Sequence, residues 1–292
     1  MKENSNRYHR SILLFGSEGQ QKLCNTNVVV AGAGGLGSAV IQHLALLGVK
    51  SVTAIDEEEL DETNRNRFVG ARHSDPIPGS AKVALVTRMV REINPDVEAV
   101  AIACSLVSEA AFSAIMATDW VFGCFDDDGP RALLNELCAA YEKPYIDLAS
   151  DVPTPGGYGG HVCVSINGDG CLDCLGLLDR KAVRRYFASK EQREREDAIY
   201  GIPAGALDKK GPSVSPLNGV IAALGAMEFM VTITELRTPT RLQKYYGYQS
   251  KVVVVRDQLL PDCPCCIGLR GLGDKADTTR YLRLPHLRKS TK

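Results

Sequence analysis

Residues 27–56 read NVVVAGAGGLGSAVIQHLALLGVKSVTAID, and this stretch decides the fold. Residues 27–31 are apolar and lead into glycines, which indicates a buried strand, while residues 36–47 have the apolar spacing of a helix. A second predicted strand, 51–56, ends in a carboxylate. The stretch therefore predicts a strand, a tight turn, a helix and a second strand, which together begin a nucleotide-binding α/β fold.

The turn between the first strand and the first helix has the sequence GAGGLG. Glycines let the backbone approach a phosphate closely, and the helix N-terminus offers free N–H groups and a positive dipole end. A carboxylate at the end of the second strand can bind ribose hydroxyls. The expected nucleotide-binding residues are Gly32, Gly34, Gly35, Gly37 and Asp56. They do not distinguish NAD from ATP, and an NAD-dependent oxidoreductase would be the default interpretation.

The following residues alternate between helical and strand patterns. We expect helices at 79–93, 108–117 and 130–141, and strands at 97–103, 120–125 and 144–148. Such alternation gives right-handed crossovers and a sheet covered by helices on both faces. The predicted fold class is α/β: a Rossmann-like, doubly wound, largely parallel sheet with a C-terminal antiparallel extension.

The second half of the chain has a different composition and pattern of residues. Glycine and proline in residues 153–160 (PTPGGYGG) predict a loop. Strands are expected at 161–166 and 251–256. The charged run 179–197 is either a solvated helix or a crossover over a substrate channel, and the first reading is slightly favoured. The polar, basic residues from 271 onward are expected to be disordered.

Composition excludes several classes of protein. The 292 residues carry a formal net charge of −1, so no global field attracts nucleic acid or an anionic membrane. Residues 215–236 are apolar but include Glu228 and Glu235, so we expect a core helix rather than a membrane span. The polar N-terminus does not resemble a signal peptide, so a cytoplasmic location with reduced cysteines is expected.

Four features favour ATP over a dinucleotide, although the fourth, RYHR (7–10) ahead of the first strand, means little by itself. Arg67, in the segment NRNRF (64–68), and Lys82, in GSAK, are candidate ligands for a triphosphate, although each could be a surface cation. Asp126 begins three consecutive aspartates after the fourth strand, at the sheet edge where ligands bind. Carboxylates beside a nucleotide suit Mg²⁺, although the next two aspartates could instead cap the following helix.

Two C-x-x-C pairs predict a metal site. Four thiolates from Cys171, Cys174, Cys263 and Cys266 would hold Zn²⁺ in a closed, structural site that tethers the C-terminal extension. Cys265 is an additional thiol that could compete as a ligand.

Together these residues resemble the ThiF/MoeB/HesA family, the bacterial relatives of ubiquitin-activating enzymes. The motifs, in order, are RYHR (7–10), GAGGLG (32–37), Asp56, NRNRF (64–68), GSAK (79–82), CFDD (124–127) followed by Arg131, and the paired C-x-x-C. Each motif is weak alone, but their order and spacing over most of the chain are specific.

The resemblance implies ATP-dependent adenylation of a carboxylate. It implies that the glycine loop cradles phosphate, that Arg67 and Lys82 hold the triphosphate, and that Asp126 organises Mg²⁺. It places Asn64 near the nucleotide. Arg10 resembles the family's arginine finger, which reaches the partner's ATP and implies a homodimer with shared active sites.

The resemblance also implies the acyl substrate, which is the C-terminal glycine of a ubiquitin-fold protein. Its tail would pass through the glycine-rich segment 153–160. No cysteine lies between Cys174 and Cys263, and Asp208 lies near the position of the family's thioester cysteine. We therefore expect the acyl-adenylate to pass to a separate sulfur donor or another nucleophile. Phe68 stands where the family usually has Gln, which is a milder change.

The implied organisation is a helical arm with the arginine finger (1–26), a nucleotide-binding Rossmann-like domain (27–150), a continuation with the substrate channel, crossover and zinc site (151–268), and a basic tail (269–292). Adenylation of a peptide or a tRNA carboxylate is the alternative with the same chemistry. An NAD-dependent oxidoreductase and a non-catalytic scaffold are alternatives from other classes.

Overall fold

The structure is a computed structural model, and it describes residues 7–154, 156–200, 211–256 and 259–287. The α-helices are α1 (His9–Cys24), α2 (Gly35–Leu47), α3 (Lys82–Ile93), α4 (Glu109–Ala117), α5 (Asp128–Ala140), α6 (Arg180–Phe187), α7 (Lys190–Tyr200) and α8 (Ser215–Ile233). The strands are β1 (Asn27–Ala31), β2 (Ser51–Ile55), β3 (Glu98–Ile102), β4 (Trp120–Gly123), β5 (Tyr145–Thr154), β6 (Gly157–Ser165), β7 (Leu242–Tyr246) and β8 (Lys251–Val254). The strand β7 follows α8 and was not expected from the sequence.

One eight-stranded sheet organises the molecule, in the order β3-β2-β1-β4-β5-β6-β7-β8. The strands from β3 to β5 pair in parallel, and those from β5 to β8 pair antiparallel. The order reverses between β1 and β4, which is the switch point where such sheets bind ligands. The predicted doubly wound sheet with an antiparallel extension is confirmed.

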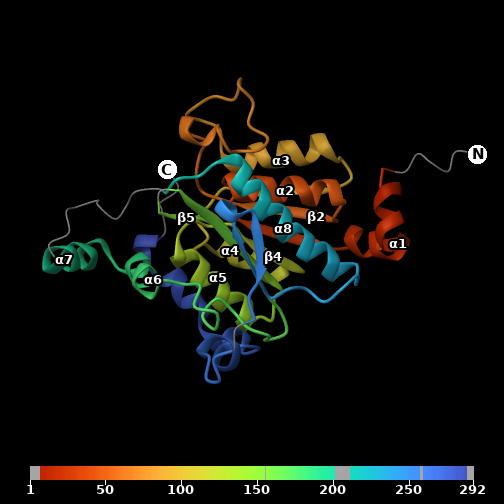
Figure 1. Cartoon of the computed structure of the whole chain (residues 1–292). Helices are drawn as coiled ribbons and strands as arrows, with labels where there is room; N and C mark the ends of the chain where they lie inside the picture. Colours follow the sequence, from red (N-terminus) through yellow and green to blue (C-terminus); the bar gives the residue numbers. More distant parts are fainter. Residues whose placement is uncertain (1–6, 155, 201–210, 257–258, 288–292) are drawn as a thin grey trace, which may run out of the picture.

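Helices cover both faces of the sheet, as Figure 1 shows. One buried cluster joins α2, α3 and α8 to the sheet through side chains such as Val40, Val86 and Phe229. A second cluster joins α4 and α5 to the other face through Phe112 and Leu133. Both faces of the sheet are therefore buried under apolar side chains.

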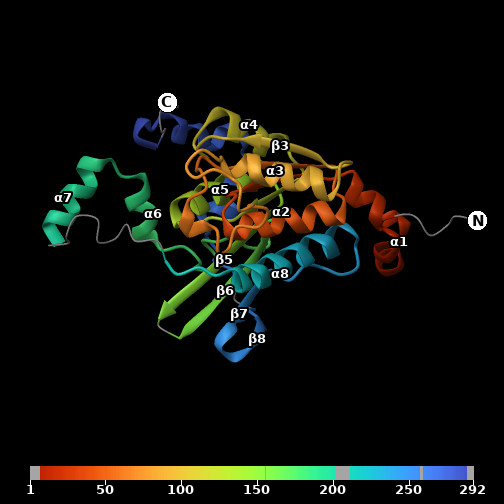
Figure 2. The same ribbon diagram turned by 90° about the horizontal axis from the view of Figure 1, so that it is seen from above.

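The glycine-rich segment 153–160 is not a loop, contrary to expectation. β5 runs to Thr154 and β6 begins at Gly157, so the two strands form a long hairpin that projects from the body in Figure 2. A Cβ on Gly159 would lie 2.1 Å from the carbonyl oxygen of Tyr245, and one on Gly160 would lie 2.3 Å from that of Ala149. Glycine is needed here because neighbouring backbones approach closely.

The apolar helix α8 is long and apolar enough to cross a membrane by composition. In its most apolar window, 56% of the residues are buried within the molecule. Its buried Glu228 forms an ion pair with Arg237 and accepts a hydrogen bond from the Gln243 side chain. These contacts identify α8 as a core helix, as expected.

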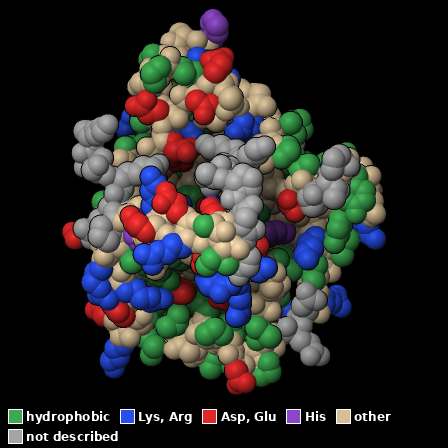
Figure 3. Space-filling view, turned by 90° about the vertical axis from the view of Figure 1, so that its left-hand side faces the viewer, with side chains coloured by type: hydrophobic (Ala, Val, Ile, Leu, Met, Phe, Trp, Pro, Cys, Tyr) green, Lys and Arg blue, Asp and Glu red, His purple; other side chains and the backbone are tan. Residues whose placement is uncertain are grey.

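The charged run forms α6 and α7, and Figure 3 shows basic and acidic side chains mixed on the face that these helices occupy. α6 is nevertheless more than a solvated face, because its Tyr186 lines a cavity in the sheet edge. The residues after 271 were expected to be disordered, but they form short 3-10 turns, with Tyr281 buried. The expected solvated helix is confirmed for the charged run, whose described residues are exposed or half-buried, whereas the expected disorder after 271 was wrong because the buried Tyr281 anchors that segment.

Candidate active site

The phosphate loop is shaped by close backbone contacts. Gly32 has a φ of 89°, and a Cβ there would lie 2.8 Å from the carbonyl oxygen of Cys124. A Cβ on Gly37 would lie 1.9 Å from the carbonyl oxygen of Gly32. α2 begins at Gly35 with Gly34 as its N-cap, and no side chain caps it. The first N–H groups of α2 therefore remain available for an anion.

Asp56 braces this loop from the end of β2. Its carboxylate accepts hydrogen bonds from the backbone N–H of Ala33, at 2.8 Å, and of Glu58, also at 2.8 Å. Burial raises the pKa of Asp56 above its ordinary value, while these N–H groups and Lys82 oppose that rise. The side chain is thus fixed beside the phosphate loop, where a ribose would lie.

Lys82 is buried and is not a surface cation. Its Nζ lies 2.5 Å from Oε2 of Glu58, and its side chain is 6% exposed. Glu58 follows Asp56 by two residues and was not predicted as a site residue, although the acidic run after β2 marks it in the sequence. The ion pair keeps the ammonium group at the cavity wall.

The two arginines of NRNRF have different tasks. Arg65 donates to Glu62 and to the carbonyl oxygens of Arg72 and Asp75, so it stabilises its own loop. Arg67 lines the cavity, and its stem lies over Gly35. Its guanidinium donates to the carbonyl oxygen of Thr63 at 2.5 Å and to Oδ1 of Asn66 at 3.1 Å, which holds it at the cavity wall.

Asn64 also lines the cavity but has a structural task as well. It is buried, and its Oδ1 accepts a hydrogen bond from the backbone N–H of Asp61 at 3.2 Å. The neighbouring Phe68 is buried in the core.

The three consecutive aspartates are used differently. Asp127 caps α5 by accepting from the backbone N–H of Gly129 at 2.9 Å. Asp128 accepts from Arg131 at 2.5 Å and from the backbone N–H of Asp179 at 2.7 Å. Asp126 is exposed to two adjoining cavities. It is the member of the trio that lines both cavities, whereas Asp127 lines only the first and Asp128 only the second.

The first cavity, of about 250 Å³, brings together the predicted nucleotide residues. Its walls include Gly32, Gly34, Gly35, Asp56, Asn64, Arg67, Lys82 and Asp126. Gly37, the last glycine of the loop, is not among the residues that line this cavity. Cys104, Ser105, Cys124 and Tyr186 also line the cavity. Sequence reasoning placed the two cysteines in the core and did not identify the serine or the tyrosine.

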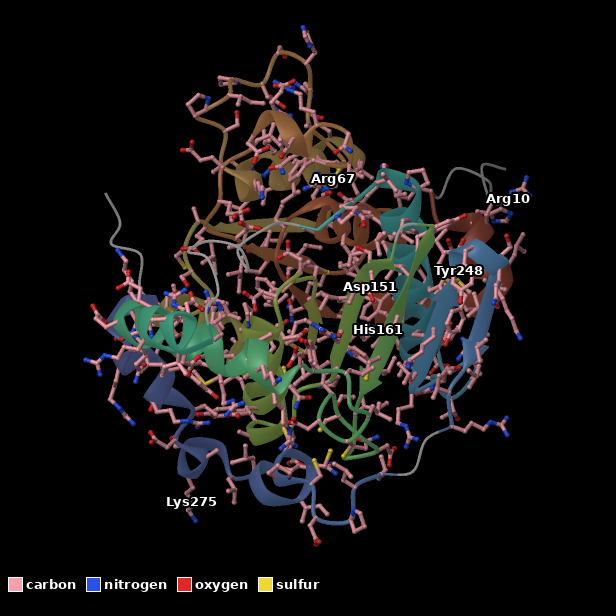
Figure 4. The ribbon with its side chains drawn as sticks, turned by 60° about the vertical axis from the view of Figure 1, so that its left-hand side comes forward. Arg10, Arg67, Asp151, His161, Tyr248 and Lys275 are labelled. Carbon is pink, nitrogen blue, oxygen red and sulfur yellow. The ribbon has the colours of Figure 1, made fainter. Side chains whose placement is uncertain are left out.

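A second cavity, of about 680 Å³, adjoins the first, and Phe125, Asp126 and Ser150 line both. Its floor comes from β5, β6 and β7, where Ala149, His161 and Lys244 share one row of the sheet. Figure 4 shows Asp151 and His161 on the hairpin. The sequence predicted a channel from the glycines but not these side chains.

A buried ion pair supports the wall of the second cavity, which Arg131 and His161 line. Asp147 accepts from Nε and Nη2 of Arg131 at 3.1 and 2.6 Å, and from the hydroxyl of Tyr145 at 2.8 Å. His161 Nε2 lies 3.2 Å from the same carboxylate. Burial alone would raise the pKa of Asp147, but Arg131 and His161 hold it well below its usual range. Arg131 thus serves the framework of the site.

Within one chain, Arg10 is not among the residues that line the nucleotide cavity. It is exposed on α1, and Figure 4 shows it at the edge of the molecule, away from Arg67.

The four predicted zinc ligands converge. Cys171 and Cys263 have their Sγ atoms 3.6 Å apart, as do Cys174 and Cys266. All four sulfurs lie within 4.8 Å of one another. Tetrahedral zinc–thiolate sites have sulfurs about 3.8 Å apart, so the donor set fits a closed structural zinc site. The Cys265 sulfur also lies close to Cys171 and Asp173, and it accepts a hydrogen bond from Asn135 at 3.2 Å.

Comparison with known proteins decides the family. The model of the ThiF family matches residues 8–265. The chain belongs to the ThiF family. It is 30% identical to "Protein HesA, vegetative" of Trichormus variabilis over 89% of this chain and 88% of that protein. It is 28% identical to "Sulfur carrier protein ThiS adenylyltransferase" of Escherichia coli, over 90% and 95% of the two chains.

A solved ThiF-like structure supports the same fold. The microcin C7 biosynthetic enzyme MccB, in complex with N-formylated MccA, superposes with a TM-score of 0.73 at 22% identity, over 90% of this chain and 75% of that one. Family membership identifies the chain as an adenylyltransferase of the ThiF/MoeB type, which uses ATP. The default interpretation of the glycine motif, an NAD-dependent oxidoreductase, is therefore wrong.

Proposed function

We propose that this protein adenylates the C-terminal glycine of a ubiquitin-fold protein of the sulfur-carrier kind, producing an acyl-adenylate and pyrophosphate. The observation that supports this most strongly is the pair of adjoining cavities. The first has the phosphate loop and the second is floored by sheet, and Asp126 and Ser150 line both. A peptide tail in the second cavity would bring its carboxylate to the α-phosphate of a nucleotide in the first.

The reaction needs positioning and charge neutralisation. One oxygen of the substrate carboxylate bonds to the α-phosphorus as the bond from that phosphorus to the bridging oxygen of pyrophosphate breaks. The carboxylate is already ionised at neutral pH, so no general base is required. This agrees with the cavity walls, which offer Lys82, Arg67 and N–H groups rather than a paired nucleophile and base.

Each residue then has a defined role. Asp56 binds the ribose, while the phosphate loop and the α2 N-terminus bind phosphate oxygens. Lys82 and Arg67 neutralise the charge that develops as pyrophosphate departs. Asp126 would hold Mg²⁺, which supplies further charge neutralisation to the triphosphate.

A glycine-ended tail suits the second cavity. Gly159 leaves part of the floor without a side chain, so an extended backbone can lie close to the sheet. Tyr158, Tyr245 and Tyr246 provide broad, amphipathic walls around it. The relative named as an adenylyltransferase of the sulfur carrier ThiS supports a substrate of this kind.

The activated acyl group would leave the active site as the acyl-adenylate, without first forming a thioester with this protein. The sequence has no cysteine between Cys174 and Cys263, and Asp208, near the family's thioester position, lies outside the described residues. A separate sulfur donor or another nucleophile would therefore receive it.

The proposed assembly is a homodimer in which Arg10 reaches the partner's ATP. Two observations support it: Arg10 is remote from its own cavity, and the neighbouring Leu13 and Leu14 are 69% and 61% exposed on the same helix. Exposed leucines beside a functional arginine suit an interface with a second copy.

ATP–pyrophosphate exchange tests the function directly. The assay would use a panel of small ubiquitin-fold proteins ending in Gly-Gly, with Asp126→Ala as the inactive variant and Asp96→Ala, an exposed change beyond the end of α3 that lines neither cavity, as a matched control. We expect exchange with one panel member, loss of at least about 100-fold in Asp126→Ala, and substantial activity in the control. Exchange supported by a free peptide but by no panel member would overturn the proposed substrate.

A further inference from the structure

The segment 277–287 follows the zinc ligands and lies outside the region matched by the family model, which ends at residue 265. It is anchored on α5. The hydroxyl of Tyr281 donates to Oε2 of Glu136 at 2.7 Å, and Arg280 forms an ion pair with the same carboxylate. The guanidinium of Arg280 lies 4.4 Å from the centre of the Tyr281 ring. A buried aromatic side chain with a satisfied hydroxyl thus fixes this segment.

From this anchor the segment contacts α6. The rings of Tyr281 and Phe187 have their centres 4.8 Å apart, and Nε2 of His286 lies 2.9 Å from the carbonyl oxygen of Phe187. Phe187 is the last residue of α6. Both contacts fix the C-terminal end of α6 in place.

The same segment contacts the opposite side of the nucleotide cavity. The carbonyl oxygen of Leu287 accepts a hydrogen bond from Oγ of Ser105 at 3.4 Å, and Ser105 lines the first cavity beyond β3. Figure 2 shows the C-terminal end of the described chain beside α4 and β3. Residues 277–287 therefore bridge α6 and the β3 side of the cavity.

Tyr186 is the residue of α6 that faces the nucleotide cavity. Its ring packs on α5 at Gly129, where a Cβ would lie 2.1 Å from its Cγ, and its ring is perpendicular to that of Phe187 at 5.1 Å. Burial, with the nearby carboxylates of Asp127 and Glu57, raises the pKa of Tyr186 to about 12. Tyr186 therefore lines the cavity from the side where α6 packs on the start of α5.

We propose that Tyr186 contacts the bound adenine nucleotide through its ring and that residues 277–287 position it by holding Phe187. This inference rests on the proposed function only for the use of ATP. Tyr186 is the contacting residue, while Tyr281 is a positioning residue that acts through Phe187. The C-terminal segment thereby completes the nucleotide site from outside the family-matched region.

Equilibrium ATP binding to the full chain tests this directly. Base–aromatic stacking contributes about 1–3 kcal/mol, so we expect Tyr186→Ala to weaken ATP binding about tenfold and Tyr186→Phe to retain nearly all of it. Tyr281→Ala should also weaken binding, by a smaller factor. Arg184→Ala, an exposed change on the same helix, should leave the dissociation constant unchanged.

The double variant separates positioning from general destabilisation. If Tyr281 acts through Tyr186, then Tyr281→Ala should have no further effect on ATP affinity in the Tyr186→Ala background. If the two substitutions weaken ATP binding independently, so that their factors multiply in the double variant, Tyr281 does not act as a positioning residue. If Tyr186→Ala leaves the affinity for ATP unchanged, Tyr186 does not contact the nucleotide. Absence of ATP binding by the unmodified protein would instead refute the proposed function, so the two failures are distinguishable.

Discussion

Asp75 is a single carboxylate that holds the loop carrying Arg67. Its two oxygens lie 2.6 and 2.9 Å from the guanidinium of Arg88 on α3, and the backbone N–H of Arg72 donates to it at 2.6 Å. Arg65 closes the same loop by donating to the carbonyl oxygen of Asp75. The position of Arg67 at the cavity therefore depends on an ion pair outside the cavity.

The Asp75–Arg88 pair makes stability depend on pH. The hydrogen bonds from Arg88 lower the pKa of Asp75 from 3.8 to about 2. A carboxyl group with a lowered folded-state pKa contributes stability above its unfolded pKa and loses that contribution as the pH falls through the folded one. We expect Asp75→Asn to lower the free energy of unfolding by about 2 kcal/mol at pH 7 and to approach the unmodified protein near pH 2.

Urea unfolding at a series of pH values checks this, with Asp96→Asn, an exposed change beyond the end of α3, as the control. A stability difference that stayed constant between pH 7 and pH 2 would show that the loss comes from packing rather than from the ion pair.

At the scale of elements, the cysteine cluster joins two segments that have little regular structure. One pair lies between β6 and α6, and the other begins the turn Pro264–Leu269 beyond β8. Asn135 of α5 donates to Cys265 and accepts from the backbone N–H of Leu172, so both segments are also attached to α5. A metal here would tie the crossover and the C-terminal segment to one helix.

We expect one zinc ion per chain, and we expect Cys174→Ser to lose it. Because structural zinc contributes directly to folding, its removal should lower the melting temperature by about 10 °C. Metal analysis and thermal unfolding measure both effects, and Cys24→Ser on α1 should retain the metal. Full zinc content in Cys174→Ser would mean that Cys265 or Asp173 replaces the lost ligand.

At the scale of the whole molecule, the proposed shared active site can be tested by mixing defects. Arg10→Ala and Asp126→Ala should each be inactive as homodimers. In a heterodimer one site carries both changes and the other carries neither, so random co-assembly should restore about a quarter of the normal exchange activity. The measurement is pyrophosphate exchange on differently tagged, co-expressed chains.

Activity that does not recover in purified heterodimers would contradict the transfer of Arg10 between subunits. A protein that is active and sediments as a monomer would contradict the dimer itself. Leu13→Ser combined with Leu14→Ser, on the exposed face of α1, should shift the assembly toward monomer.

Local sequence patterns were sufficient to predict much of the fold, the phosphate loop and the cysteine cluster. The run from Asn27 to Asp56 predicted its strands and helix because buried parallel strands are short and apolar, and because glycines mark a phosphate turn. The convergence of four cysteines was also predictable, since their spacing alone provides two pairs of candidate metal ligands. Such features depend on residues close in sequence or of unmistakable chemistry.

The sequence by itself determined the class of fold, the phosphate loop and the family. Only the tertiary structure decided which role each of two residues of the same type has. Arg65 stabilises its loop, whereas Arg67 lines the nucleotide cavity. Asp127 caps α5, whereas Asp126 lines both cavities. The tertiary structure also showed that glycines in β6 permit close strands and that Tyr281 fixes a polar tail. These outcomes depend on contacts between distant residues, which local periodicity does not encode.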